Sequence, residues 1–498
     1  MSLNPEPSRP DERAAHDLPP KSYAEAAEEP LEQSHASQTD GTSERVADKV
    51  KNIRANGRIA IPTPAPADGD QQQFEGAGLD SSPKSPTRSH RRKVSLKSSS
   101  NGSIGRKHGE HIHGDAFEKH ADGNGHALTS VKPAAGTKPL ARRDSTLQTG
   151  RQAGAGWSKS KIRWAPWNVP LQRRLQTVAV LMHTLSIAGL VSIFFFLCTI
   201  PLLWPILLPY TLYVLFSNAG SSGELSFRSE RWRRSSIWSA FASYFPARLH
   251  RSEELEPTRK YVFGYHPHGI ISHGAFAAFA TEALGFSNLF PGITNTLLTL
   301  DGNFKLPLYR EYALRMGLAS VSRDSCENIL SKGGRNGEGM GRAITIVVGG
   351  ARESLESKPG TNHFILNRRQ GFVKLAIRQG ADLVPVFGFG ENDIYEQLDP
   401  HAHPWINKIQ LLVKKVMGWT VPIFHARGIF NYDVGMMPYR RPMNIVVGRP
   451  IRVVQDKTPD KDYVDQVHAE YMRELQRVWD DHKDTFAKKR TEEMQIIE

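Results

Sequence analysis

The stretch that decides the fold is YVFGYHPHGIISHG, residues 261–274. It opens with an apolar run that is typical of a strand buried on both faces. His266 and His268 follow on either side of Pro267, and Gly269 then lets the chain turn without a side chain over the site. An imidazole titrates near neutral pH and can act as a base, an acid or a metal ligand. The stretch therefore predicts either a structural turn or a reactive histidine at a strand end.

Short apolar runs continue along the chain and alternate with helical patterns. Residues 371–380 have the pattern of a helix between two strands, and residues 462–486 space their apolar residues by three and four, which predicts a packing helix without chemistry. Residues 405–419 predict a basic amphipathic helix that lies either on a bilayer or on the domain's own sheet. The predicted strands are 261–265, 343–348, 383–387 and 444–447. Together these patterns predict an α/β fold with a mixed sheet flanked by helices, over residues 235–498.

An apolar run without formal charge occupies residues 175–216. One membrane-spanning helix needs only roughly 20 residues, and three prolines interrupt the run near its middle. Basic residues flank it on both sides, which places both ends in the cytosol. Within the juxtamembrane region 157–234 we therefore predict a hydrophobic hairpin, either two short spans or a re-entrant wedge. A buried helix pair of a soluble core is the less favoured alternative, because such helices rarely lack charge over this length.

Residues 1–156 are rich in Ser, Gly, Pro and charged residues, and such a composition predicts a disordered tail. Serines next to proline or after basic residues, at 81–100 and 141–146, resemble kinase substrates. The tail is therefore either a phosphorylated regulatory segment or a solvated one without further role.

The bulk composition leaves several partners open. A net charge of +13 indicates a polyanionic partner, with nucleic acid, an anionic membrane and a phosphorylated co-substrate as candidates. The two cysteines provide no disulfide framework and no CxxC zinc pattern, so a reducing, cytosol-facing environment is expected.

Several common chemistries lack their sequence signatures. The chain has no GxSxG motif for a serine hydrolase. Other histidines are present, but none has HExxH or similar spacing, so we predict no metal; they are His273, His363, His401, His403 and His425. The glycine cluster 332–342 precedes a strand and lacks the GK[ST] ending of a phosphate loop, which predicts a flexible surface loop. By contrast, Glu353 follows the predicted strand 343–348 and can orient an imidazole that acts as general base.

Several motifs occur together and in one order, over roughly residues 170–455. They are FGYHPHG (263–269), FKLPLYREY and GLASVSRD (304–324), VGGARESL (348–355), RQGFVKLAIRQGADLVPVFGFGEN (369–392) and HARGIF (425–430). With these motifs the chain resembles the type 2 diacylglycerol acyltransferase family.

The resemblance implies a membrane-anchored O-acyltransferase that moves a fatty acyl group from acyl-CoA to the free hydroxyl of diacylglycerol. The product would be triacylglycerol, at the endoplasmic reticulum membrane and the lipid droplet surface. Acyl-CoA is then a co-substrate, and no cofactor or nucleic acid is expected. A non-catalytic droplet coat protein, and an enzyme that acylates monoacylglycerol or a long-chain alcohol, stay open. Acyl-chain preference and a homo-oligomeric state stay open as well.

The resemblance also implies site residues. The distantly similar glycerophosphate-type acyltransferases have an aspartate five residues after the histidine, but here Ile271 and His273 stand at those positions. We therefore predict His268 or His266 as the base, favouring His268 beside the Gly269 turn, with Glu353 as the orienting carboxylate. The substrate-binding positions implied by the motifs are Gly269, Arg323, Arg369, Lys374, Glu391 and Asn392, with the three basic residues facing coenzyme A phosphates.

Overall fold

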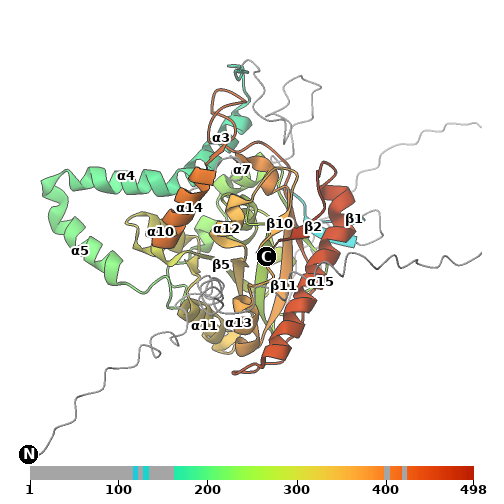
Figure 1. Cartoon of the computed structure of the whole chain (residues 1–498). Coiled ribbons are helices and arrows are strands. Elements are labelled where there is room, and N and C mark those ends of the chain that lie inside the picture. Colours follow the sequence, from blue (N-terminus) through green and yellow to red (C-terminus); the bar gives the residue numbers. More distant parts are fainter. Residues whose placement is uncertain (1–115, 122–126, 134–161, 398–403, 418–422, 498) are drawn as a thin grey trace, which may run out of the picture. The chain divides into compact units, whose positions relative to one another are not determined.

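A computed structural model of the chain describes residues 116–121, 127–133, 162–397, 404–417 and 423–497 (Figure 1). Every described residue falls in one of the two units into which the chain divides, the unit that includes His113–Glu498. The other unit, Leu31–Ile112, and the remainder of the predicted tail lie outside the described residues.

A nine-stranded mixed sheet organises the described part of the chain, as the alternating pattern predicted. Five neighbouring strands run parallel, while β14 and β11 pair antiparallel. In sheet order the strands are β1 (Phe117–Ala121), β2 (Ala127–Val131), β3 (Arg248–Arg251), β14 (Asn444–Val447), β11 (Ala381–Phe389), β4 (Lys260–His266), β9 (Arg342–Val347), β5 (Thr294–Thr299) and β6 (Ala319–Ser320). The four predicted strands correspond to β4, β9, β11 and β14.

The central strands are apolar on both faces because helices cover both. All nine residues of β11 are buried, as are six of the seven residues of β4. Helix α15 (Lys461–Phe486) packs along β11 and directs Val464, Leu475 and Val478 into the core (Figure 1). The predicted helices 371–380 and 462–486 are confirmed as α13 (Gly371–Gln379) and α15.

The other helices connect and cover the strands. They are α6 (Glu230–Arg233), α7 (Ser236–Tyr244), α8 (His273–Ala275), α9 (Phe286–Leu289), α10 (Tyr309–Arg315), α11 (Arg323–Ser331), α12 (Gly350–Leu355) and α14 (Pro404–Met417), with the short helical turns η4 (Phe276–Ala280), η5 (Asp301–Lys305) and η6 (Asn392–Ile394). Three pairs of short strands lie outside the main sheet: β7 (Gly333–Gly334) with β8 (Glu338–Met340), β10 (His363–Phe364) with β15 (Gln495–Ile496), and β12 (Glu396–Gln397) with β13 (Phe424–His425).

The prediction of a wholly disordered tail over residues 1–156 is wrong for β1 and β2. These two strands form an antiparallel hairpin, and β2 pairs with the edge strand β3. Leu128 and Ser130 of β2 are buried, at 1% and 0% exposure. The sequence composition averaged over the tail hid this short alternating segment, which gains its stability by adding to an existing sheet edge.

A truncation experiment follows from this hairpin. We expect deletion of residues 1–115 to leave acyl transfer and the thermal unfolding midpoint near wild type, because it removes no described residue. Deletion of residues 1–156 should lower the midpoint by several degrees, since it uncovers β3 and removes buried Leu128. Thermal unfolding of both purified proteins measures the difference. Equal midpoints for the two truncations would contradict a structural role for β1 and β2.

The apolar run 175–216 folds as three helices with two breaks. Helix α3 (Leu171–Thr184) meets α4 (Ser186–Cys198) at a bend of 66°, and η3 (Pro201–Leu203) separates α4 from α5 (Trp204–Phe216). The second break is the one that the prolines predicted. Within the described residues, no single helix combines the length and apolar character of a membrane span, and α3 and α4 pass that test only as a bent pair.

The glycine cluster 332–342 is more ordered than predicted. β7 and β8 pair with each other inside it, and positive φ angles at Gly333, Gly334 and Gly339 allow the tight course of the backbone.

Helix α14 corresponds to the predicted basic amphipathic helix, which was expected to lie either on a bilayer or on the domain's own sheet. Its Trp405, Ile409 and Leu412 are exposed, so these side chains do not pack on the sheet.

Candidate active site

The residues predicted as catalytic come together at the carboxyl edge of the parallel strands. The HPHG turn, residues 266–269, follows β4, while Gly349 and Gly350 follow the neighbouring strand β9 and lead into α12. Glu391 follows β11 on the other side of β4. Because the three strands are parallel, their ends meet at one edge, where α/β folds place reactive groups.

His266 is a core residue. Its side chain is fully buried, and its Nε2 lies 2.9 Å from the hydroxyl of Tyr471 on α15. That hydroxyl donates to the carbonyl of Gly264 at 3.1 Å, so it accepts the Nε2 proton of His266. Burial lowers the pKa of His266 to about 3, and the charge of Arg369 acts in the same direction. His266 is therefore held neutral and has no access to solvent.

The Tyr471 contact depends on a glycine in the middle of β4. A Cβ atom at Gly264 would lie 2.0 Å from the Tyr471 hydroxyl oxygen. Only glycine leaves room for this hydroxyl to reach the strand, so Gly264 allows the bond that fixes His266.

His268 differs from His266 in being partly exposed. Its Nδ1 lies 2.9 Å from the carbonyl oxygen of Gly269. A carbonyl only accepts hydrogen bonds, so Nδ1 carries the proton and the lone pair resides on Nε2. Burial lowers the pKa of His268, partly offset by the Gly269 carbonyl. The imidazole is thus neutral near pH 7 and presents a basic nitrogen that has no partner among the described residues.

Glu353 contacts the turn through the backbone and not through an imidazole. Its Oε1 accepts from the main-chain N–H of His268 at 2.6 Å, and its Oε2 accepts from the N–H of Ile365 at 3.1 Å. Burial raises the pKa of Glu353 to about 7, against the effect of these two bonds and of Arg369. The predicted carboxylate–imidazole hydrogen bond is absent from these described residues, because both oxygens face main-chain donors.

Arg369 and Gly350 lie beside the same carboxylate. A Cβ at Gly350 would approach the Arg369 guanidinium to 3.4 Å, and a Cβ at Gly349 would overlap the Glu353 carboxyl group. Arg369 is 8% exposed, and its charge acts on His266, His268 and Glu353. Glu353 of α12 and Arg369, which precedes α13, thus place a buried carboxylate and a buried cation beside the glycine turn after β9.

A second buried carboxylate supports the turn from the β11 side. Glu391 accepts through Oε2 from the Tyr265 hydroxyl at 2.7 Å and from the Gly274 N–H at 2.8 Å. Gly269 has a φ of +61°, and a Cβ there would come within 2.7 Å of the Glu391 Cγ. Burial raises the pKa of Glu391 to about 7. The glycine is therefore required both for its backbone conformation and for the close approach of Glu391.

The remaining predicted residues are Arg323, Lys374 and Asn392, and two of them bond other groups. Arg323 begins α11 and pairs with Glu327 at 3.1 Å. Lys374 is exposed on α13. Asn392 is buried and holds two loops together, since it accepts from Ser357 Oγ and donates to the Thr361 carbonyl.

Sequence reasoning missed Tyr471 and Tyr265. Tyr471 was assigned to the packing face of the last helix without chemistry, yet its hydroxyl fixes the tautomer of His266. The sequence shows Tyr471 as the one tyrosine among aliphatic residues on the packing face of this helix. That pattern suggests a hydroxyl in the core but does not identify His266 as its partner. Tyr265 lay within the decisive stretch, and only the fold brings its hydroxyl to Glu391.

The histidines considered as metal ligands lie apart or outside the described residues. His363 bonds Glu492 at 2.9 Å, His425 lies 3.4 Å from Glu396, and His273 bonds the Tyr395 hydroxyl. His401 and His403 fall outside the described residues. The described part of the chain contains no group of three or more His, Cys, Asp or Glu side chains that could hold a metal ion. The prediction of no metal and no cofactor stays a prediction.

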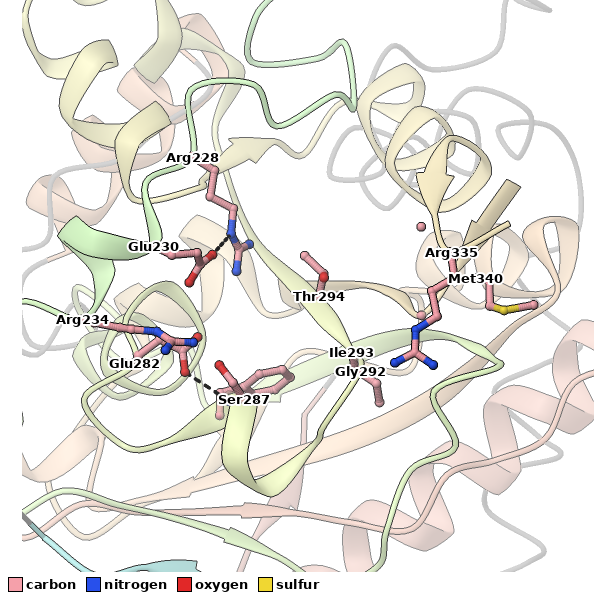
Figure 2. Close-up of a pocket in the computed structure, with 13 residues that line it drawn as sticks. Arg228, Glu230, Arg234, Glu282, Ser287, Gly292, Ile293, Thr294, Arg335 and Met340 are labelled. Atoms are coloured by element: carbon pink, nitrogen blue, oxygen red, sulfur yellow. Dashed lines mark hydrogen bonds and ion pairs between the residues drawn. The ribbon is translucent and has the colours of Figure 1, made fainter. Parts of the chain in front are cut away.

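An open cavity of about 440 Å³ lies elsewhere in the fold (Figure 2). Its walls include Thr294 at the amino end of β5 and Gly341 just before β9. The HPHG turn follows the carboxyl end of the parallel strand β4, so the cavity and the turn are at opposite edges of the sheet.

Known proteins are similar to the part of the chain that forms the sheet and its helices. The sequence model described as diacylglycerol acyltransferase matches residues 194–497. The chain is 47% identical over 342 residues to diacylglycerol O-acyltransferase 2A of Umbelopsis ramanniana, covering 68% of this chain and 94% of the relative. It is 44% identical to diacylglycerol O-acyltransferase 1 of Schizosaccharomyces pombe, over 65% of this chain and 91% of the relative.

A further relative carries another name. The 2-acylglycerol O-acyltransferase 1 of Bos taurus is 41% identical, over 65% of this chain and 96% of that protein. No solved structure matches the chain. The fold and the matches define an O-acyltransferase of glycerolipids. The chain belongs to the type 2 diacylglycerol acyltransferase family, as its motifs predicted.

Proposed function

We propose that this acyltransferase moves a fatty acyl group from acyl-CoA to the free hydroxyl of diacylglycerol and so forms triacylglycerol. The observation that carries the proposal is the state of His268. Its Nδ1 is bound to the Gly269 carbonyl, and its Nε2 is unbound among the described residues at a partly exposed position. This is the arrangement that a general base needs when it receives a proton from an alcohol.

In the proposed mechanism, Nε2 of His268 removes the proton from the acceptor hydroxyl as its oxygen attacks the thioester carbonyl. The tetrahedral intermediate then collapses, the carbon–sulfur bond breaks, and the imidazolium returns the proton to the leaving coenzyme A thiolate. An ester replaces the thioester, and no acyl-enzyme is formed. The thioester is already activated, so the proposal requires no cofactor.

The oxyanion of this intermediate needs N–H donors. The N–H of His268 already donates to Glu353, so it is not available for this purpose. We therefore assign the oxyanion to other N–H groups of the glycine turns at 269 and 349–350. Glu353 acts in this scheme as a positioning residue, because it holds the main chain of the base.

The anionic end of acyl-CoA is proposed to face the basic residues at the same edge. Buried Arg369 lies beside the HPHG turn, and Arg323 begins the helix that follows β6 at the carboxyl edge. A guanidinium can bind a phosphate with two parallel hydrogen bonds. The exposed Lys374 is the weaker candidate for this role.

The apolar helices before the catalytic domain are proposed to anchor the enzyme in the lipid phase where diacylglycerol dissolves. Phe195, Trp204 and Phe216 are exposed on α4 and α5, at 64%, 51% and 83%. Contact with water over so large an apolar surface is unfavourable, and lipid relieves it. We therefore propose the endoplasmic reticulum membrane and the lipid droplet surface as locations, with both termini cytosolic.

Two other readings are testable. The bovine relative's name favours a monoacylglycerol as an alternative acceptor. The exposed apolar helices alone also suit a protein that coats droplets. A kinase acting on the tail and a homo-oligomeric state stay predictions from the sequence.

The test uses microsomes from a host without neutral-lipid synthesis that expresses the full chain. Labelled acyl-CoA is supplied with diacylglycerol, monoacylglycerol or a long-chain alcohol, and the products are separated. We expect triacylglycerol to form fastest. A faster product from another acceptor would reassign the substrate, and no labelled ester from any acceptor would reject the enzyme reading.

A further inference from the structure

The cavity at the amino edge of the sheet has its own charged lining (Figure 2). Residues that follow the apolar helices, Arg228, Glu230 and Arg234, form one side, and Arg335 from the segment between β7 and β8 lies on another. None of these residues belongs to the acyl-transfer site, which lies at the opposite edge.

The two carboxylates of the cavity are already neutralised. Arg233 is 1% exposed, and its Nη1 lies 3.0 Å from Glu230 and 3.1 Å from Glu282. Arg228 also pairs with Glu230, at 2.5 Å, and donates to the Asn295 carbonyl. Arg228 and Arg233 therefore already balance the charge of the two carboxylates.

Two guanidiniums remain without an ion-pair partner in the part of the chain that the structure describes. They belong to Arg234 and Arg335, and both side chains are exposed. The cavity lining has three guanidiniums and two carboxylates, and the buried Arg233 behind it adds a fourth guanidinium, which leaves an excess of two positive charges. Arg228 is 11% exposed, and burial and the charge of Arg233 lower its pKa. Water therefore screens the repulsion between Arg228 and Arg233 only poorly.

The positions of the neighbouring groups suit a small anion. Gly292 has a φ of +83°, and a Cβ there would lie 2.9 Å from the Arg335 guanidinium, so glycine allows Arg335 to lie over the cavity wall. The hydroxyl-bearing side chains of Ser287 and Thr294 line the same space. Arginine and hydroxyl donors around an excess of two charges match a phosphate group in charge and in hydrogen bonding.

We propose that this cavity binds a phosphate monoester, with Arg234 and Arg335 as its principal ligands. A phosphate monoester carries about −1.5 to −2 charges at neutral pH, which balances the excess of the site. The monoester is either the head group of a lipid or a soluble phosphate, and both present the same chemistry to the arginines.

The experiment measures binding to the purified full-length protein in detergent micelles. Inorganic phosphate and glycerol phosphate are titrated, with chloride at equal ionic strength as the reference. Arg335→Ala and Arg234→Ala should each weaken binding on the order of tenfold, the loss expected for a charge-assisted hydrogen bond. Arg473→Ala removes an exposed arginine on α15 and serves as the matched control, with wild-type affinity expected.

Vesicles identify the source of the phosphate. Phosphatidylcholine vesicles with phosphatidic acid should bind Arg335→Ala more weakly than Arg473→Ala if the ligand is a lipid head group. If the ligand is soluble, only glycerol phosphate and inorganic phosphate distinguish the two variants. The proposal is overturned if neither phosphate nor phosphatidic acid distinguishes Arg335→Ala from Arg473→Ala. Because acyl transfer is not the readout, this failure leaves the proposed function untouched.

Discussion

Replacement of His268 by alanine is expected to lower the rate of triacylglycerol formation by on the order of a hundred- to ten-thousand-fold. The variant loses the only basic nitrogen of the HPHG turn that is partly exposed and unbound among the described residues. Among the described residues, the side chain bonds only the adjacent Gly269 carbonyl, so the fold should tolerate its removal. Acyl transfer in microsomes at equal protein abundance measures the effect.

Two other histidines are replaced for comparison, one as a control for activity and one as a control for stability. His363→Ala removes an imidazole whose hydrogen bond is to Glu492 and not to the turn, and it should keep wild-type activity. His266→Ala removes a buried ring from beside Tyr471 and should lower the unfolding midpoint as well as the rate. Normal activity of His268→Ala would exclude this residue as the base.

The pH dependence of the acyl-transfer rate tests the role of His268 independently. The proposed mechanism needs neutral His268, and its folded pKa lies below the ordinary value near 6.5 because partial burial disfavours the charged ring. We therefore expect the wild-type rate to stay high down through pH 6.5 and to fall only at lower pH. Glu353 has a pKa of about 7, so the test is made in Glu353→Gln: a rate of that variant that falls as pH drops from 8 to 7 would contradict this assignment.

The second large effect is expected for Glu353→Gln. A glutamine has one acceptor oxygen, so either the His268 N–H or the Ile365 N–H loses its partner in a buried position. An unsatisfied buried donor costs about 1–3 kcal/mol, and a displaced base lowers turnover by on the order of a hundredfold. We expect kcat to fall while the acid limb of the pH profile stays where it was, because the carboxylate contacts only the backbone of His268.

Glu356→Gln provides the matched control at the end of the same helix, and wild-type turnover is expected. An acid limb that shifts in Glu353→Gln would favour the carboxylate–imidazole dyad that the sequence predicted. Unchanged turnover in Glu353→Gln would remove this residue from both the predicted dyad and the positioning role.

Much of the fold could be predicted because its signals are local. Central strands that are buried on both faces consist of continuous apolar residues, and β4, β9 and β11 were found for this reason. The break before η3 was found because proline removes a backbone donor. The hairpin of β1 and β2 was missed because its strands are short and depend on the edge of β3 for stability.

The candidate site could be predicted only as a set of residue types. The motif placed two histidines at a strand end and a carboxylate after the neighbouring strand, but gave no atom-to-atom contact. In the structure Glu353 reaches the N–H of His268, while Tyr471, more than 200 residues along the chain, reaches His266. Asn392 was grouped with the substrate-binding residues, but its amide is engaged by Ser357 and Thr361.

The sequence by itself determined the class of fold and the family, because apolar periodicity and ordered motifs are properties of neighbouring residues. The reactive groups that it predicted stay a proposal. Only the tertiary structure decided which imidazole is accessible, since His266 and His268 differ in burial and not in chemistry. It also separated the HPHG turn from the arginine-lined cavity, because parallel strands place their two ends at opposite edges of the sheet. Such distinctions depend on side chains that packing brings together from distant parts of the chain.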